Sequence, residues 1–456
     1  MKPSSQDKQT RMLESSPEHL ICSLALPTII SMLVTTFYNM ADTFFVTKLS
    51  SSATSATGAV SVVFSYMAIV QAFGFFFGHG SGNFISRELG KNNTREAEKM
   101  AATGFFSALF FGFFLMIVGL LFLEPMARFL GATDTILPYA KTYLAIILLV
   151  TPYMTAALVL NNQLRFQGNA MFAMIGITAG GLLNVALDPL LMFVFDLGIA
   201  GAAIATSFSQ LVSFILLYIG TVRSDNLKIR RKNFSPSWKN YRILFNGGVP
   251  SLARQGLSSV ANIVLNWVAH PYGDAAIAAL AICSKLMGFA SSVLIGFGQG
   301  FQPVCGFNYG AGRYDRVIRS FWFCVRTAFV GLLLVSATGY LFAEPLVGLF
   351  KTDDPQVALL AAKTLRWQVL TLPTSCWVVL ANMMLQTIGQ AGKATVLAMA
   401  RQGLMFIPAV LILPLFLKLN GILCAQAVAD LLSFLLALPL TISVLRDMQR
   451  RLSDAA

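Results

Sequence analysis

The chain has 456 residues, of which 56% are hydrophobic and only 12% are charged. Soluble globular chains carry about 25% charged residues, and a water-soluble fold of this size would need more polar surface to cover its core. The composition therefore excludes a soluble enzyme, a disordered scaffold and a disulfide-rich secreted module, and it indicates a multi-spanning membrane protein. The six cysteines show no paired spacing, so we interpret them as small core residues.

Twelve apolar blocks are long enough to cross a bilayer, which takes about 20 residues of helix. The sequence therefore predicts an all-α integral membrane protein with twelve transmembrane helices. Because the number of spans is even, both termini should lie on the same side. The blocks lie near residues 20–47, 53–78, 99–122, 137–160, 170–195, 199–222, 243–269, 275–300, 317–343, 357–387, 394–417 and 421–445.

The Lys and Arg residues indicate which side that is. Of the 33, 22 lie in the two terminal segments and the connections after even-numbered spans, whereas four lie in the connections after odd-numbered spans. Cytoplasmic loops are enriched in Lys and Arg, so both termini are predicted to be cytoplasmic and the protein to reside in the plasma (inner) membrane. The net charge of +13 then reflects loops that face anionic lipid, and no nucleic-acid partner is expected.

The two halves of the chain repeat each other at an offset of about 220 residues. Residues 124–130 (EPMARFL) and the Thr133-Asp134 that follows them match 344–350 (EPLVGLF) and Thr352-Asp353. Pro152 matches Pro373. Two parallel six-helix repeats are related by a pseudo-two-fold axis along the membrane normal and place a site between them, which favours a transporter over a channel, a receptor or an enzyme. The predicted segments are an N-terminal tail 1–19, an N-lobe 20–222, a basic linker 223–242, a C-lobe 243–445 and a C-terminal tail 446–456.

Three aspartates, Asp42, Asp188 and Asp430, fall inside predicted spans, where an ionised carboxylate costs about 2.5–3.5 kcal/mol on insertion scales. Helical spacing places Asp42 on one face with Asn39, and Asn184 one turn before Asp188. A close pair of carboxyls can take up protons or a cation as a unit; alternatively, the polar groups only bond helices together. For Asp430 the second interpretation is favoured. Further polar residues of these spans are Thr35, Tyr38, Asn161, Asn162 and Thr206.

Other residues predict conformational or packing roles. Pro27 and Pro189 break the helical hydrogen-bond ladder and are predicted hinges. The three histidines lack metal-ligand spacing, so no metal site other than one for Na⁺ at the aspartates is expected. For the basic residues in or near the second-half spans, snorkelling or pairing with carbonyls is favoured over the alternative of substrate binding; they are Arg254, Lys285, Arg326, Arg366 and Arg401.

Three groups of motifs together resemble the multidrug and toxic compound extrusion (MATE) transporters. They are 38–46 (YNMADTFFV); 184–190 (NVALDPL) with 198–203 (GIAGAA); and 298–303 (GQGFQP) with 308–311 (NYGA). The resemblance covers nearly the whole chain. It implies a cation-coupled exporter whose two six-helix lobes alternate around a central cavity.

The resemblance also implies roles for single residues. In the DinF-like branch, carboxylates matching Asp42 and Asp188 form the proton or sodium site. In contrast to the NorM-like branch, no acidic residue occurs in the seventh span, where the equivalent position is Ser258, so the resemblance implies coupling in the first half. The implied polar partners match Asn161, Asn184 and Thr206, the residues near the site match Tyr38 and Tyr143, and the first-span bend matches Pro27.

We therefore predict a secondary active antiporter, not an enzyme, that exports hydrophobic or cationic compounds in exchange for H⁺ or Na⁺. It should need no cofactor and act as a monomer. Candidates for the substrate cavity are Tyr38, Asn39, Tyr143 and Asn162. The alternative is a flippase of the same superfamily for lipids or lipid-linked precursors, which should have a lateral cleft lined by cations.

Overall fold

The computed structural model describes residues 5–46, 48, 53–223, 227–350 and 354–454, and these contain helices but no strand. The first half comprises α1 (Ser5–Glu14), α2 (Pro17–Val46), α3 (Ala53–Gly90), α4 (Thr94–Leu121), α5 (Leu123–Phe129), α6 (Leu137–Phe166), α7 (Ala170–Pro189), the π-helical η1 (Leu190–Val194) and α8 (Gly198–Arg223). A 3₁₀ turn, η2 (Arg231–Asn233), lies in the basic linker. The second half comprises α9 (Trp238–Ala269), the 3₁₀ turn η3 (His270–Tyr272), α10 (Asp274–Gly310), α11 (Tyr314–Leu341), α12 (Ala343–Gly348), α13 (Pro355–Ile388), α14 (Ala391–Met399), the π-helical η4 (Ala400–Leu404), α15 (Phe406–Leu417) and α16 (Leu419–Ser453).

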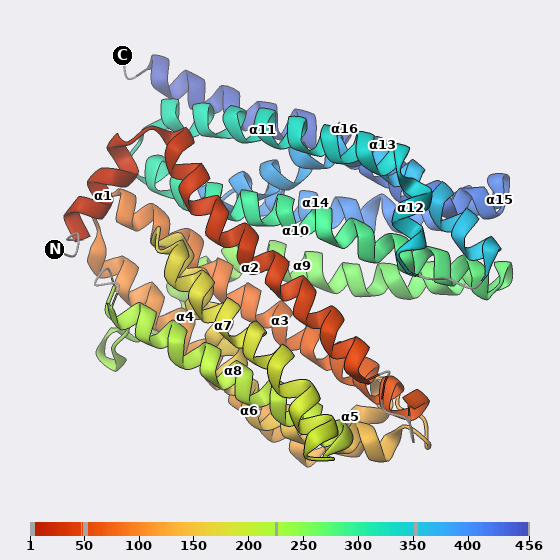
Figure 1. Ribbon diagram of the computed structural model, residues 1–456. Helices are drawn as coiled ribbons and strands as arrows, with labels where there is room; N and C mark the ends of the chain where they lie inside the picture. Colours follow the sequence, from red (N-terminus) through yellow and green to blue (C-terminus); the bar gives the residue numbers. More distant parts are fainter. Residues whose placement is uncertain (1–4, 47, 49–52, 224–226, 351–353, 455–456) are drawn as a thin grey trace.

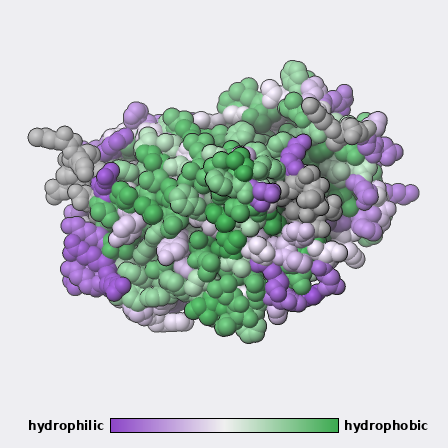
Figure 2. Space-filling view, turned by 60° about the horizontal axis from the view of Figure 1, so that its bottom comes forward, coloured by the Kyte–Doolittle hydropathy of each residue, from purple (hydrophilic) through white to green (hydrophobic). Residues whose placement is uncertain are grey.

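The helices have the length and the surface of membrane spans. Within the described residues, eleven of them are long and apolar enough to cross a bilayer. The remaining predicted span corresponds to α9, whose 32 residues are also long enough, although Lys239, Arg242 and Arg254 make it more polar. Large apolar side chains such as Phe114 and Leu334 are exposed, and Figure 2 shows a broad hydrophobic surface between two hydrophilic edges. The all-α membrane fold is thus confirmed.

The two halves form two lobes that lie side by side (Figure 1). Both termini lie at one end of the molecule, and the short helices α5 and α12, which carry the repeated Glu-Pro motif, lie at the other. The matched Thr352-Asp353 lies outside the described residues. Part of the predicted N-terminal tail folds as α1, whose buried Met12 accepts a hydrogen bond from Asn308 at its carbonyl oxygen.

The lobes approach each other most closely through glycines near the end that carries the termini. A Cβ on Gly80 of α3 would lie 2.4 Å from the carbonyl oxygen of Leu244 in α9, and one on Gly300 of α10 would lie 2.5 Å from the backbone of Ala25 in α2. Small residues let membrane helices pack at such short distances. The glycine-rich stretch 296–300 therefore serves helix packing.

Polar contacts reinforce this junction, which we call the closed end. Thr28 donates to the carbonyl oxygen of Gly296 at 2.6 Å. The Thr387 hydroxyl hydrogen-bonds the Asn83 side chain at 3.1 Å, and Arg87 donates to the Thr387 carbonyl oxygen. Toward α5 and α12 the ribbons of the two lobes diverge (Figure 1). The two lobes are therefore in contact at the end that carries the termini and separate toward the opposite end.

Gly80→Val should weaken the closed end, because the added side chain would meet the backbone of Leu244. We expect several-fold less oxidative cross-linking between cysteines introduced as Asn83→Cys and Thr387→Cys than in the same pair with Gly80 intact. Gly331→Val is the matched control, since a Cβ at Gly331 of α11 has no neighbour within 4 Å. Equal cross-linking with and without Gly80→Val would contradict this account of the junction.

Candidate functional site

Two carboxyl groups lie together inside the N-lobe. Asp42 is near the end of α2 and is 4% exposed, and Asp188, next to last in α7, is completely buried. The two are close enough to interact electrostatically. The carboxyls predicted to form a pair are thus brought together from helices that are far apart in the sequence.

Neighbouring helices supply polar groups to this pair. Asn184 lies one turn before Asp188, as the sequence predicts, and its Nδ2 donates to Asp188 Oδ1 at 3.2 Å and to Thr206 Oγ1 of α8 at 3.3 Å. Tyr143 of α6 is 1% exposed, and its hydroxyl lies within electrostatic reach of both carboxyls. Four helices, α2, α6, α7 and α8, therefore enclose the site.

Carboxylate oxygens of the site lack hydrogen-bond donors within the part of the chain that the structure describes. Among the described residues, Asp42 Oδ1 and Asp188 Oδ2 are buried without a hydrogen-bond partner. The ion pairs of the same part of the chain involve neither aspartate. Buried charges are normally paired, and unsatisfied buried atoms often mark a missing ion or water. Carboxylate, hydroxyl and amide oxygens suit protons or a hard cation such as Na⁺.

Polar cavities adjoin this site. One of about 340 Å³ is lined by Tyr38, Asn39, Gln71 and Gln210, among others, and one of about 80 Å³ by residues that include Asn161, Asn184 and Thr206. The carboxyls of Asp42 and Asp188 line neither cavity. Asp188 lies behind Asn184, which does line the smaller one. The sequence analysis did not single out Gln71 for this cavity; an isolated amide in an apolar helix such as α3 was the available signal.

Not all the predicted cavity residues reach these cavities. Tyr143 is buried behind the wall, beside the carboxyls. Asn162 is fully buried elsewhere, and its Oδ1 accepts a hydrogen bond from Arg165 at 2.8 Å. Arg165 in turn lies 3.5 Å from His79, whose Nδ1 is 2.9 Å from the Ser251 hydroxyl in the other lobe. The structure thus assigns Asn162 to packing near the closed end rather than to the cavity wall.

Asn161 has a partner that recurs in the other lobe. Its Nδ2 donates to the carbonyl oxygen of Ala173 at 3.2 Å, and the repeat-related Asn382 donates to the carbonyl oxygen of Ala394 at 2.6 Å. The amide nitrogen therefore ties two helices together in both lobes. Beyond this packing contact, a role of Asn161 in coupling stays a prediction.

The two predicted hinge prolines occupy different settings. Pro27 is buried inside α2, which continues through it as a helix, and lies beside the junction made by Thr28. Pro189 is the last residue of α7 and is followed by the π-helical η1. Proline and π-helical turns both weaken the backbone hydrogen bonding of a helix. The hinge function of these two prolines stays a prediction.

In the C-lobe, Asp430 of α16 is paired. Its Oδ1 accepts hydrogen bonds from Arg401 Nε at 2.8 Å and from Gln426 at 2.9 Å. The interpretation of Arg401 as a snorkelling or carbonyl-pairing residue is therefore wrong, since its partner is a carboxylate on another helix. The ion pair agrees with the structural role favoured for Asp430.

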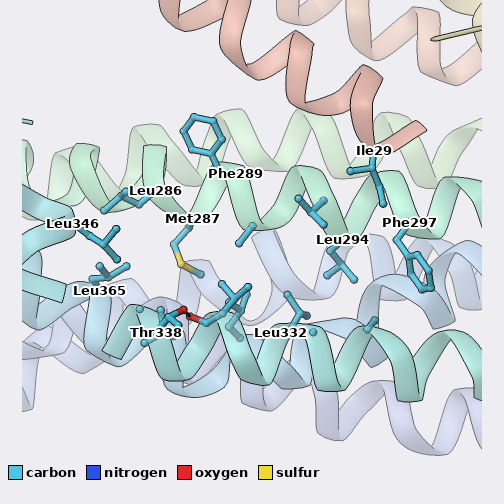
Figure 3. Close-up of a pocket in the computed structure, with 18 of the residues that line it drawn as sticks. Ile29, Leu286, Met287, Phe289, Leu294, Phe297, Leu332, Thr338, Leu346 and Leu365 are labelled. Carbon is cyan, nitrogen blue, oxygen red and sulfur yellow. Dashed lines mark hydrogen bonds between the residues drawn. The ribbon is translucent and has the colours of Figure 1, made fainter. Parts of the chain in front are cut away.

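A larger cavity, of about 630 Å³, lies between α10, α11 and α13 of the C-lobe (Figure 3). Its wall is apolar and includes Met287, Phe289 and Phe297, with Thr338 among its few polar members. Its lining, as far as the structure describes it, contains no Lys or Arg. It therefore lacks the cations expected of a lateral cleft for a lipid pyrophosphate.

These features define a class of protein. Two repeated helical lobes in a membrane, with unpaired carboxyls beside a polar cavity in one of them, are the architecture of a secondary transporter. The MatE family model matches residues 27–190 and again 250–411, one match in each repeat. The chain belongs to the MatE family of transporters.

Similar proteins agree with this assignment. The chain is 29% identical over 445 residues to the multidrug export protein MepA of Staphylococcus aureus (strain MRSA252), covering 97% of each chain, and 28% identical to that of Staphylococcus haemolyticus (strain JCSC1435), covering 93% of each. Its fold matches the outward-facing conformation of a multidrug resistance MATE family transporter with a TM-score of 0.90 at 24% identity, over 97% of this chain and 98% of that one. The twelve-helix, two-lobe fold is thereby confirmed.

Asn161→Ala and Asn382→Ala should each lower the stability of the protein. Each substitution removes a side-chain hydrogen bond that ties two helices together, which contributes about 0.5–1.5 kcal/mol to the free energy of unfolding. The measurement is the thermal unfolding midpoint of the purified protein. An unchanged midpoint in Asn161→Ala together with a lowered one in Asn382→Ala would show that the N-lobe contact is not structural.

Proposed function

We propose that the protein exports hydrophobic and cationic compounds from the cell in exchange for H⁺ or Na⁺. The observation that carries this proposal is the pair of buried carboxyls, Asp42 and Asp188, without a cationic partner among the described residues and beside a polar cavity. The named relatives, which are multidrug export proteins, support export of drug-like compounds. The family membership supports coupling to an ion rather than to ATP hydrolysis.

The larger N-lobe cavity, of about 340 Å³, suits such compounds. Tyr38, Phe64, Met67 and Met154 supply aromatic and thioether surface to its wall. Aromatic faces attract cations, and methionine adapts to ligands of different shape. Amides such as Gln71 and Gln210 offer hydrogen bonds without fixing a charge. This composition supports broad rather than narrow substrate recognition.

Coupling follows from the cost of leaving the carboxyls ionised and unpaired. A proton or Na⁺ that reaches Asp42 and Asp188 removes that cost, and the conformation in which the cation is bound more tightly gains population. Movement of α2 and α7 would carry this change to the smaller N-lobe cavity, because Tyr38 and Asn184 on these helices line that cavity. Cation entry would thus favour substrate release, and substrate binding would favour cation release.

Asp42→Asn and Asp188→Asn should each abolish gradient-driven export, because an amide takes up neither a proton nor, with comparable affinity, Na⁺. The measurement is efflux of a fluorescent cationic dye from proteoliposomes on which a pH gradient and a Na⁺ gradient are imposed separately. Asp196→Asn is the matched control, since Asp196 is exposed after η1 and has a positive φ that asparagine adopts well. Normal efflux in both variants would refute the proposed coupling site, and lipid scrambling without dye efflux would favour the flippase.

We further propose that both termini and the basic linker face the cytoplasm, as the distribution of Lys and Arg favours. Cysteine introduced as Lys232→Cys, at an exposed position of the linker, should be inaccessible to a membrane-impermeant maleimide in intact cells and should react after the membrane is opened. Thr133→Cys, exposed in the connection at the opposite end, should react in intact cells. The reverse pattern would invert the orientation.

A further inference from the structure

A polar cavity of about 220 Å³ lies in the C-lobe beside Arg401. Its wall combines polar side chains, such as Ser258, Asn262 and Gln402, with apolar ones, such as Phe406. Arg401 is the one residue with a formal charge in this wall as far as the structure describes it. Asp430, its partner, is 1% exposed and does not line the cavity.

This cavity is the repeat counterpart of the smaller N-lobe cavity. The sequence repeat matches Ser258 to Thr35 and Gln426 to Thr206, which line the smaller cavity, and Asn262 to Asn39, which lines the larger N-lobe cavity. The acidic residues are not repeated: the positions that match Asp42 and Asp188 hold Leu265 and Ala409, and a guanidinium, Arg401, stands where the N-lobe has glycine. Duplication thus produced two related cavities of opposite character, one beside carboxyls and the other beside a guanidinium.

The guanidinium is fixed in place and still has donors to offer. Arg401 lies on the π-helical η4, and its Nε and one Nη donate to the two carboxylate oxygens of Asp430 at 2.8 and 3.5 Å. Gln426 donates to the same carboxylate at 2.9 Å and so helps to hold it. Because an arginine has five N–H donors, those not directed at Asp430 remain for an acceptor in the cavity.

We propose that this C-lobe cavity binds the acidic group of small aromatic or amphiphilic carboxylates, with Arg401 as the binding residue and Asp430 and Gln426 as positioning residues. Charge-assisted hydrogen bonds from arginine to a carboxylate are about twice as strong as neutral ones, and they gain strength where water is scarce. The apolar part of the ligand would contact Phe406, Met287 and Leu265. The inference widens the substrate class of the proposed exporter to acidic compounds, but the binding itself does not depend on export.

The test is equilibrium binding of radiolabelled 2-naphthoate and of its neutral, equally shaped analogue 2-naphthamide to the full-length protein in lipid nanodiscs, with empty nanodiscs subtracted. We expect 2-naphthoate to bind at least about tenfold more tightly than 2-naphthamide. The variant Arg401→Gln/Asp430→Asn removes both charges together, so that no buried charge is left alone, and it should abolish the preference. Equal affinities in the unaltered protein, or a preference that persists in this variant, would overturn the proposal.

Two further variants separate binding from folding. Arg366→Gln/Glu344→Gln removes the partly exposed ion pair of the same lobe and should leave the preference unchanged; a lost preference there would argue against a specific site at Arg401. Gly288→Met extends a side chain from a position with open space around its Cβ, leaves the Arg401–Asp430 pair intact and should abolish 2-naphthoate binding. Undiminished binding in Gly288→Met would place the ligand outside this cavity. Normal export in both Asp42→Asn and Asp188→Asn, with the naphthoate preference intact, would refute the proposed coupling site and leave this inference standing.

Discussion

The cost of burying a charge in an apolar medium governs the organisation of this protein. A chain with 12% charged residues keeps most of them at the ends of its helices, where water and lipid headgroups solvate them. Within the lobes this constraint is met in two ways. In the C-lobe, Asp430 is neutralised by Arg401; in the N-lobe, Asp42 and Asp188 have no such partner among the described residues. The proposed cation coupling depends on this unpaired arrangement in the N-lobe.

The closed end of the molecule depends on a different constraint, which is steric. Helices α2 and α3 of one lobe approach α10 and α9 of the other so closely that a Cβ on Gly80 or Gly300 would collide with backbone. Hydrogen bonds such as that from Thr28 to Gly296 then form across the junction. Large apolar side chains of both lobes, such as Phe76, Leu244 and Phe301, are buried in one cluster near this junction, so apolar burial stabilises the closed end together with the close packing and the polar bonds.

Duplication connects the two lobes but does not make them equivalent. The Asn161–Ala173 and Asn382–Ala394 bonds are the same contact made twice, because helix packing is needed in both halves. The side chains around the two cavities have diverged instead, with acids in the first half and a guanidinium in the second. The packing contact is thus retained in both lobes, whereas the polar side chains around the two cavities differ.

The sequence by itself determined the helical membrane fold and the internal repeat, and it singled out Asp42, Asp188 and Asn184 as polar residues within the spans. Hydrophobic block length and the penalty for a carboxylate in a span are local properties, and a one-turn spacing such as Asn184–Asp188 is enough to predict a shared face. The tertiary structure alone decided that Arg401 pairs with Asp430, that Arg165 lies beside His79 of another helix, and that Gln71 reaches the cavity. Each of these contacts joins different helices or depends on which face of a helix is buried. Their partners are chosen by the rotation and crossing of helices around the lobe, which no local pattern encodes.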